Sequence, residues 1–179
     1  MLSRLFGQSG LFGREDALAP VRPLWHRVVE IARERAWYAD YDVADTVPGR
    51  FDAITLVLAL ILLRMEQDET LMEPSVRLTE IFIDDMDGQL RQTGLGDLVV
   101  GKHVGKLMGT LGGRLGALRE VLAPGATATD DAVLAEVIAR NVTLIEGGDA
   151  AKLAPAVRAL AGTLAALSSQ DLMAARIVR

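Results

Sequence analysis

The chain contains one long apolar segment, residues 53–63, in which only Thr55 is polar. At 1.5 Å per residue, a helix over this segment spans roughly 16 Å, about half of the 30 Å hydrocarbon core of a bilayer. The segment is therefore too short to cross a membrane, and an apolar surface on all sides suits a helix buried inside a protein. We expect a helix over residues 51–66 at the centre of the fold, with an interfacial helix as the alternative.

Helical spacing and capping signals continue along most of the chain, and no stretch alternates for long enough to predict a strand. Half of the residues are apolar and 24% are charged, which excludes disorder. The sequence therefore predicts an all-α fold, a single-domain bundle of about six helices in residues 20–179 after a flexible segment at 1–19. The expected helices cover residues 24–37, 51–66, 73–92, 97–122, 130–145 and 150–167, and Ser168 and Ser169 are expected to cap a short last turn.

The residues that usually carry catalysis or bind metals are scarce. The chain has no Cys and only His26 and His103 as imidazoles, and no Ser lies in a nucleophile-elbow motif. The acidic cluster at 84–87 lacks the long oxygen-rich loop of a calcium site. Residues 96–102 match most of the phosphate-binding loop GxxxxGK[ST], but His103 replaces the hydroxyl residue and no strand precedes the loop. We therefore predict no enzyme, with no catalytic residue, cofactor or metal.

The third expected helix, residues 73–92, separates charged from apolar side chains. Its charged stripe consists of Arg77, Glu80, Asp84, Asp87 and Arg91. Its apolar side consists of Val76, Phe82, Ile83, Met86 and Leu90. Asp85 breaks the pattern because it falls inside the apolar arc, where an unpaired carboxylate is costly. We predict that Asp85 faces the core and that Arg50 or Lys102 supplies its cation.

The fourth expected helix, residues 97–122, has an aliphatic stripe on one side and glycines on the other. The stripe consists of Val100, Val104, Leu107, Leu111, Leu118 and Leu122. The glycines are Gly101, Gly105, Gly109, Gly112 and Gly116, with Lys102 and Lys106 beside them. Each helical glycine costs about 1 kcal/mol relative to alanine, so we expect something to approach this side closely. Two candidates remain open, a neighbouring helix of the same chain or a helix of a partner.

The N-terminal segment and the net charge bear on location and partners. Apolar and basic side chains interleave there, a pattern that either contacts a bilayer surface peripherally or belongs to a frayed terminus. They are Leu2, Arg4, Leu5, Phe6, Leu11, Phe12 and Arg14. No long apolar stretch resembles a secretion signal, which predicts a cytoplasmic protein, with peripheral contact at the inner membrane as a further possibility. The net charge of −5 argues against specific nucleic-acid binding.

Several segments match a known family when their order and spacing are taken together. They are DTVPGRFD at 45–52, the apolar helix that follows it, DDMD at 84–87, GLGDLVVGK at 94–102 with Lys106, and more weakly RNV at 140–142 and the alanine-rich C-terminal helices. In these segments the chain resembles the ubiquinol-cytochrome c chaperone family, the assembly factors of the respiratory cytochrome bc complex. The resemblance covers roughly residues 20 to 175, and its combined motifs are more specific than any one of them.

The resemblance implies an all-helical, non-catalytic chaperone that binds newly made cytochrome b or another membrane-protein client, and mitochondrial relatives also work near the ribosome. Because the chain lacks an Arg- and Ser-rich transit extension, it looks like a bacterial member acting at the cytoplasmic side of the inner membrane. The alternative is a soluble helical adaptor with a different client. The predicted partner-binding residues, among which Arg50 and Asp85 support the site, are Arg50, Asp85, Asp87, Arg91, Lys102, His103, Lys106 and Arg114.

Overall fold

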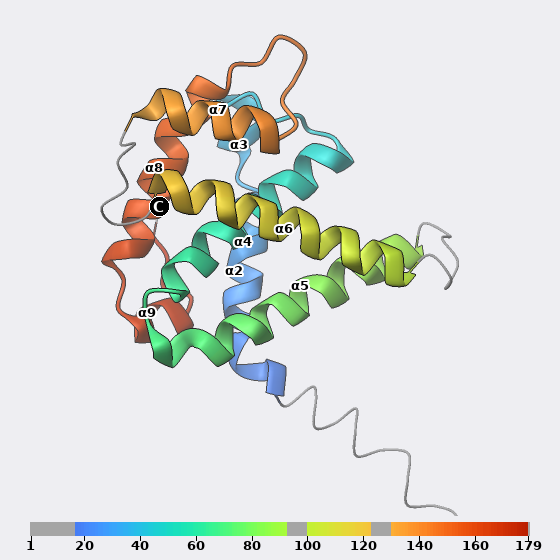
Figure 1. Ribbon diagram of the computed structural model, residues 1–179, viewed down its shortest axis with the longest axis vertical. Helices are drawn as coiled ribbons and strands as arrows, with labels where there is room; N and C mark the ends of the chain where they lie inside the picture. The colour runs from blue at the N-terminus through green and yellow to red at the C-terminus, as the bar shows by residue number, and fades with distance from the viewer. Residues whose placement is uncertain (1–16, 93–99, 123–129, 179) are drawn as a thin grey trace, which may run out of the picture.

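Helices built from the predicted segments pack around the apolar segment in a computed structural model (Figure 1), which describes residues 17–92, 100–122 and 130–178. Side chains are described from 17 to 89 and again from 105 onward within these ranges. The elements are η1 (Ala19–Val21), α2 (Arg22–Ala32), α3 (Arg35–Ala39), α4 (Val47–Met65), η2 (Glu69–Leu71), α5 (Met72–Gln92), α6 (Val100–Leu122), α7 (Asp131–Asn141), α8 (Ala150–Ala166) and α9 (Ser169–Met173). The predicted all-α fold is confirmed. Most of the predicted N-terminal segment lies outside the described residues.

The central helix is α4, as the apolar segment predicts. Thr46 caps its start by accepting a hydrogen bond from the Gly49 amide at 3.3 Å. Leu58 and Ile61 are fully buried, and α2, α6 and α8 all pack against α4. A helix that is enclosed on every side can be apolar on every side, which explains the uninterrupted segment. Among the described residues, no helix has the combined length and apolarity that a membrane span requires.

The first predicted helix is broken in two, which the periodicity over residues 24–37 did not indicate. α2 ends at Ala32 and α3 begins at Arg35. The break leaves carbonyl groups at the end of α2 without helical partners. The buried Trp37 indole N–H donates to the Ile31 carbonyl at 2.6 Å, and the Tyr38 hydroxyl donates to the Ala32 carbonyl at 2.7 Å. The aromatic residues after the break therefore stabilise it.

α7 is shorter than predicted, because residues 142–145 are extended instead of helical. The Ala44 amide donates to the Thr143 carbonyl at 2.9 Å, and the Ile145 amide donates to the Asp42 carbonyl at 2.9 Å. These bonds flank an isolated antiparallel bridge between Val43 and Leu144. Pairing with a segment about 100 residues earlier thus overrides the local helical pattern.

Polar side chains cap the helix starts in the C-terminal half. Asp130 accepts from the Ala132 amide at 2.9 Å and begins α7, and Asp149 accepts from the Ala151 amide at 2.9 Å and begins α8. Ser168 accepts from the Asp171 amide at 3.1 Å and begins α9, which confirms the predicted last turn.

The segment after α9 returns to α2. Leu172 and Ile177 are buried, and the Arg27 guanidinium donates to the Ile177 carbonyl from Nε at 3.1 Å and from Nη2 at 2.7 Å. The first long helix is therefore held by residues near the end of the chain.

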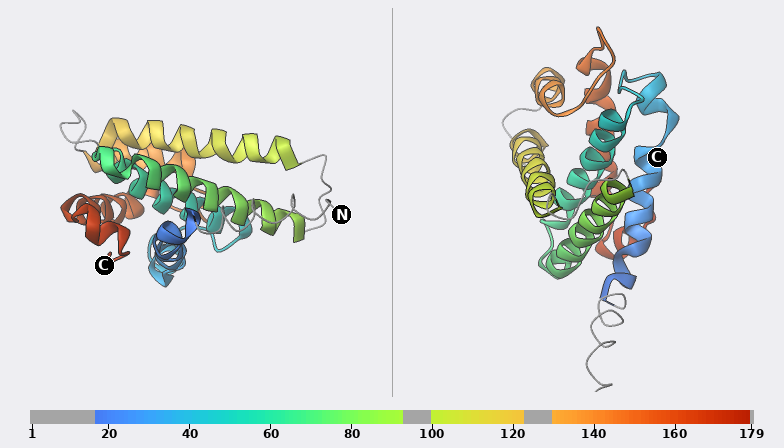
Figure 2. Two further views of the ribbon diagram at one scale, coloured as in Figure 1. Left: turned by 90° about the horizontal axis from the view of Figure 1, so that it is seen from below. Right: turned by 90° about the vertical axis from the view of Figure 1, so that its right-hand side faces the viewer.

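α5 and α6 lie side by side as the two longest helices of the molecule's described part. Figure 2 shows that the end of α5 and the start of α6 extend past the other helices on one side of the molecule. These two ends carry most of the residues predicted to bind a partner.

Candidate partner-binding surface

One side of α6 faces the core. Leu107, Leu111, Leu118 and Val121 are buried, and Leu122 is half-buried against them. These residues recur at three- and four-residue spacing, so they form one stripe along the helix. The described members of the predicted aliphatic stripe therefore pack as expected, while the side chains of Val100 and Val104 lie outside the described residues.

The opposite side of α6 carries a surface that we call the glycine face, made of Gly105, Gly109, Gly112 and Gly116. A Cβ atom added to any of the four would meet no described atom within 4 Å beyond the helix's own backbone. A neighbouring helix of the same chain does not cover this face in the described part of the fold, so that candidate explanation for the glycines is wrong for these four. Gly101, the fifth predicted member, falls outside the side-chain description.

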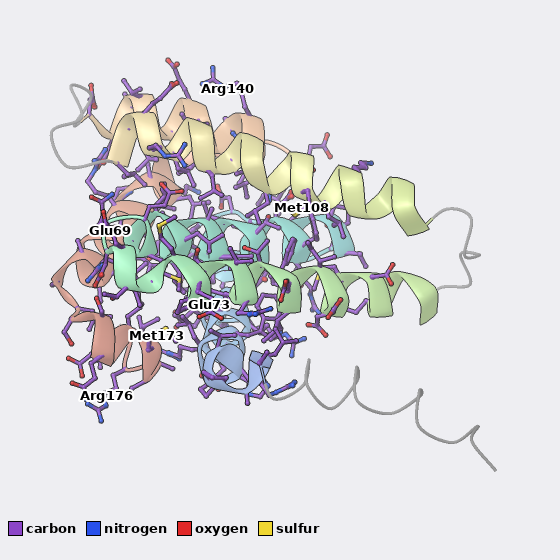
Figure 3. All side chains as sticks on the ribbon, turned by 60° about the horizontal axis from the view of Figure 1, so that its bottom comes forward. Glu69, Glu73, Met108, Arg140, Met173 and Arg176 are labelled. Carbon is purple, nitrogen blue, oxygen red and sulfur yellow. The ribbon has the colours of Figure 1, made fainter. Side chains whose placement is uncertain are left out.

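The glycine face is not explained by the stability of α6 itself. Four helical glycines cost roughly 4 kcal/mol relative to alanine. Within the described residues no close contact at these positions offsets the cost. Lys106 is exposed beside the face, and Met108, labelled in Figure 3, is 44% exposed on its other flank. The face thus offers an accessible helix backbone between a cation and an apolar side chain.

Arg114, which we predicted to bind a partner, does not lie on this surface. Its side chain is 8% exposed, and its guanidinium forms an ion pair with Asp52 of α4. The same guanidinium lies over the Phe51 ring at 5.9 Å from the centroid. Direct contact with a partner would require this buried pair to open, because Arg114 sits within the core stripe of α6.

Asp52 joins three parts of the fold through its carboxylate. One oxygen accepts from Arg114 of α6. The other accepts from Thr143, from the amide at 2.8 Å and from the hydroxyl at 2.6 Å. Sequence reasoning missed this role, although Asp52 closes the DTVPGRFD motif and is a charged residue at the start of the apolar segment. A charge in that position signals a buried polar contact, but it does not identify the partner.

Asp85 is exposed, so its predicted burial is wrong. Asp85 does lie on the arc of α5 that faces the core, as predicted, since Leu78 on the same arc is fully buried. However, Asp85 belongs to the C-terminal part of α5, the helix whose end extends past the other helices in Figure 2, and Gln89 on the same arc is exposed as well. The core-facing arc therefore reaches solvent at this end of the helix.

Arg50 does not pair with Asp85 either. It donates from Nε to Asp45 Oδ1 at 2.6 Å, and both side chains are more than half exposed. The Arg50 hydrogen bond lowers the pKa of the Asp45 carboxyl below its ordinary value. This local pair joins the first turn of α4 to the residue before its cap.

The side chains of the remaining predicted site residues are only partly described by the structure. Asp87 is half-buried on α5 and already makes an interaction, as Asp84 does. The side chains of Arg91, Lys102 and His103 lie outside the described residues. Lys106, one of the eight predicted partner-binding residues, therefore has a described side chain that lies directly beside the glycine face. No three His, Asp or Glu side chains within the described ranges could hold a metal ion.

Comparisons with known proteins agree on one family. The family model of the ubiquinol-cytochrome C chaperone matches residues 39–179. Among solved structures, the chain is similar to the crystal structure of the Cbp3 homolog from Brucella abortus, with a TM-score of 0.76, 31% sequence identity and coverage of 93% of both chains. A comparison with curated proteins finds no match.

Proposed function

Because this chain belongs to the ubiquinol-cytochrome C chaperone family, we propose that it is a non-catalytic assembly chaperone for the ubiquinol-cytochrome c reductase complex. Its client is a membrane subunit of that complex, and cytochrome b is the subunit that we propose. The client-binding surface is the glycine face of α6. The observation that carries the proposal is the open space above four glycines, which no described residue of the chain fills.

A glycine face suits a helical client for a geometric reason. Small residues at four-residue spacing let two helix backbones approach closely, as they do in membrane bundles. A membrane subunit consists of apolar helices that must be shielded from water before assembly. Contact along the glycine face would bury part of such a helix, with Met108 adding an adaptable apolar contact at its edge.

Charge on the neighbouring helix ends would direct the encounter. Lys106 is exposed beside the glycine face, and Lys102 and His103 precede it in α6. Asp85 and Asp87 lie on the adjacent end of α5, followed by Arg91. Mixed charges around an apolar contact set orientation and association rate more than affinity. Arg50 stands near the start of α4 and would support the site from there.

The direct test is co-purification of cytochrome b with the tagged protein from membranes solubilised in mild detergent, quantified by immunoblot. The double variant Gly109→Leu, Gly112→Leu fills the open face with good helix formers and blocks close approach. We expect at least a tenfold loss of recovered cytochrome b, equivalent to about 1.4 kcal/mol of binding free energy.

The matched control is Gly162→Leu in α8, where an added Cβ also meets no described atom within 4 Å. This variant should recover as much cytochrome b as the unmodified protein. Equal recovery by the double variant would show that the glycine face is not the client surface. Recovery by none of the three folded proteins would instead exclude cytochrome b and favour a soluble adaptor with another client.

Charge steering has its own test in the variant Lys102→Glu, Lys106→Glu. We expect weaker recovery, and a smaller dependence on salt than the unmodified protein shows. An unchanged salt dependence would show that these lysines do not belong to the client-binding surface. Peripheral membrane contact, checked by co-fractionation without detergent, and proximity to the ribosome remain predictions.

A further inference from the structure

The buried ion pair between Asp52 and Arg114 is a costly way to join two helices. Their side chains are 11% and 8% exposed, so both charges are largely removed from water. Replacing such a pair by apolar residues of similar volume is often neutral or stabilising. Within the described residues, Arg114 Nε is also buried without a hydrogen-bond partner. Stability alone therefore does not account for a guanidinium in the middle of the aliphatic stripe of α6.

The ion pair allows one rotation of α6 about its axis, whereas the aliphatic stripe allows more than one. Leucines at three- and four-residue spacing can pack against α4 in more than one rotation of α6. Arg114 cannot, because its guanidinium meets one Asp52 carboxylate oxygen, approaches the Asp52 carbonyl at 3.4 Å from Nη1 and covers the Phe51 ring. The carboxylate is itself held in place by Thr143 at its other oxygen.

The direction of Arg114 determines the direction of the glycine face. At 100° per residue, Gly105 lies about 180° from Arg114 around the axis of α6, and the other three glycines lie within roughly 40° of that direction. We propose that Asp52 and Arg114 are a positioning pair that fixes the rotation of α6 on α4, so that the glycine face points away from the core. The inference concerns the fold and does not depend on the identity of the client.

The test measures the placement of α6 directly by electron paramagnetic resonance. The chain has no Cys, so two introduced cysteines carry the only spin labels. Glu120→Cys on α6 and Ala159→Cys on α8 place the labels at exposed positions. We expect a single narrow distance distribution for the protein that is otherwise unchanged.

The decisive variant is Asp52→Leu, Arg114→Met, which removes both charges and leaves no buried group unpaired on either helix. Thr143 is exposed, so its donors can turn to water. We expect a cooperative thermal transition at or above the original midpoint, together with a broadened or shifted label distance. Rotation by one residue moves a surface label by about 8 Å, given a helix radius of 5–6 Å with side chains.

Two further variants separate positioning from packing. Leu118→Met alters the same stripe without changing its volume much and should keep the narrow distance. Arg114→Lys keeps the charge and should keep the mean distance. The proposal is overturned if the apolar double variant gives the original narrow distance. It is overturned equally if that variant fails to fold, because the pair would then serve stability.

Discussion

α4 and α6 both contain glycine, but for opposite reasons. A Cβ on Gly49 in α4 would lie 1.9 Å from the Ala44 carbonyl oxygen, so the fold leaves no room for a side chain there. The glycine face of α6 has open space at every described position. One glycine is required by the path of its own chain, whereas the others cost helix stability without a described internal benefit.

The difference extends to the whole of each helix. α4 is buried along nearly all of its length, so each residue is constrained by neighbours that belong to the same chain. α6 is constrained along its core stripe, at Arg114, and at Arg119, which forms an ion pair with Glu66 at the end of α4. A Cβ added on its glycine face, in contrast, meets no described atom within 4 Å beyond the helix's own backbone. Comparing the two helices therefore separates residues that serve folding from residues that are available to a partner.

The largest expected effect is on α4. Leu58→Ala removes a fully buried side chain and leaves a cavity, which should lower the free energy of unfolding by about 2–5 kcal/mol. Urea denaturation monitored by far-UV circular dichroism measures this loss. A change below about 1 kcal/mol would contradict the central position of α4.

The two kinds of glycine predict opposite signs of effect. Gly49→Ala should destabilise the fold by roughly 1–3 kcal/mol or more, because the Ala44 carbonyl would have to move. The same denaturation experiment measures the change. A stability equal to that of the unmodified protein would mean that the start of α4 can shift at little cost.

On α6, Gly109→Ala with Gly112→Ala should stabilise the protein by roughly 2 kcal/mol, since alanine is the better helix former and the added methyl groups enter open space. Client recovery should fall at the same time. Gly162→Ala in α8 is the matched control, with a gain of about 1 kcal/mol and unchanged recovery. A double variant that gains stability and keeps full recovery would contradict the role of the face.

The smallest expected effect is the pH dependence of stability that comes from the hydrogen bonds to Asp68. Asp68 accepts hydrogen bonds from the Ser169 hydroxyl and from the hydroxyl and amide of Thr70. These bonds, of which the one from Ser169 has the largest effect, lower the pKa of the Asp68 carboxyl from 3.8 to about 2. Since the folded pKa lies below the unfolded one, the contribution to stability is complete above about pH 4 and is lost as the pH falls towards 2.

Thermal midpoints of the unmodified protein and Asp68→Asn should therefore differ at pH 6 and converge near pH 2. Client recovery at neutral pH should be the same for both proteins, because Asp68 is not part of the glycine face. Midpoints that differ equally at both pH values would show that the carboxylate charge is not the cause.

The sequence predicts those features of the fold that depend on neighbouring residues. Caps at Asp130, Asp149 and Ser168 could be recognised because a polar side chain acts on amides two or three residues later. The early end of α7 could not, because it depends on the pairing of Val43 with Leu144. Local patterns contain no information about that distant partner.

The candidate surface shows the same division. Periodicity identified the two sides of α6, including glycines opposite leucines. It could not show that no described helix covers the glycines, that Asp52 reaches Arg114 across 62 positions of sequence, or that the arc of Asp85 passes into solvent. Each of these depends on where helices end and how they cross, which only the assembled fold decides.

The hydrogen bonds from Arg27 to the Ile177 carbonyl also have a consequence for the timing of synthesis. The two residues are 150 positions apart, so at about 5–20 residues per second α2 waits roughly 8 to 30 seconds for this contact after it has been translated. During that interval the apolar side of α2 has no access to Leu172 or Ile177. A protein that we propose shields unfinished subunits of another complex thus has a helix of its own that lacks part of its packing until residue 177 has been translated.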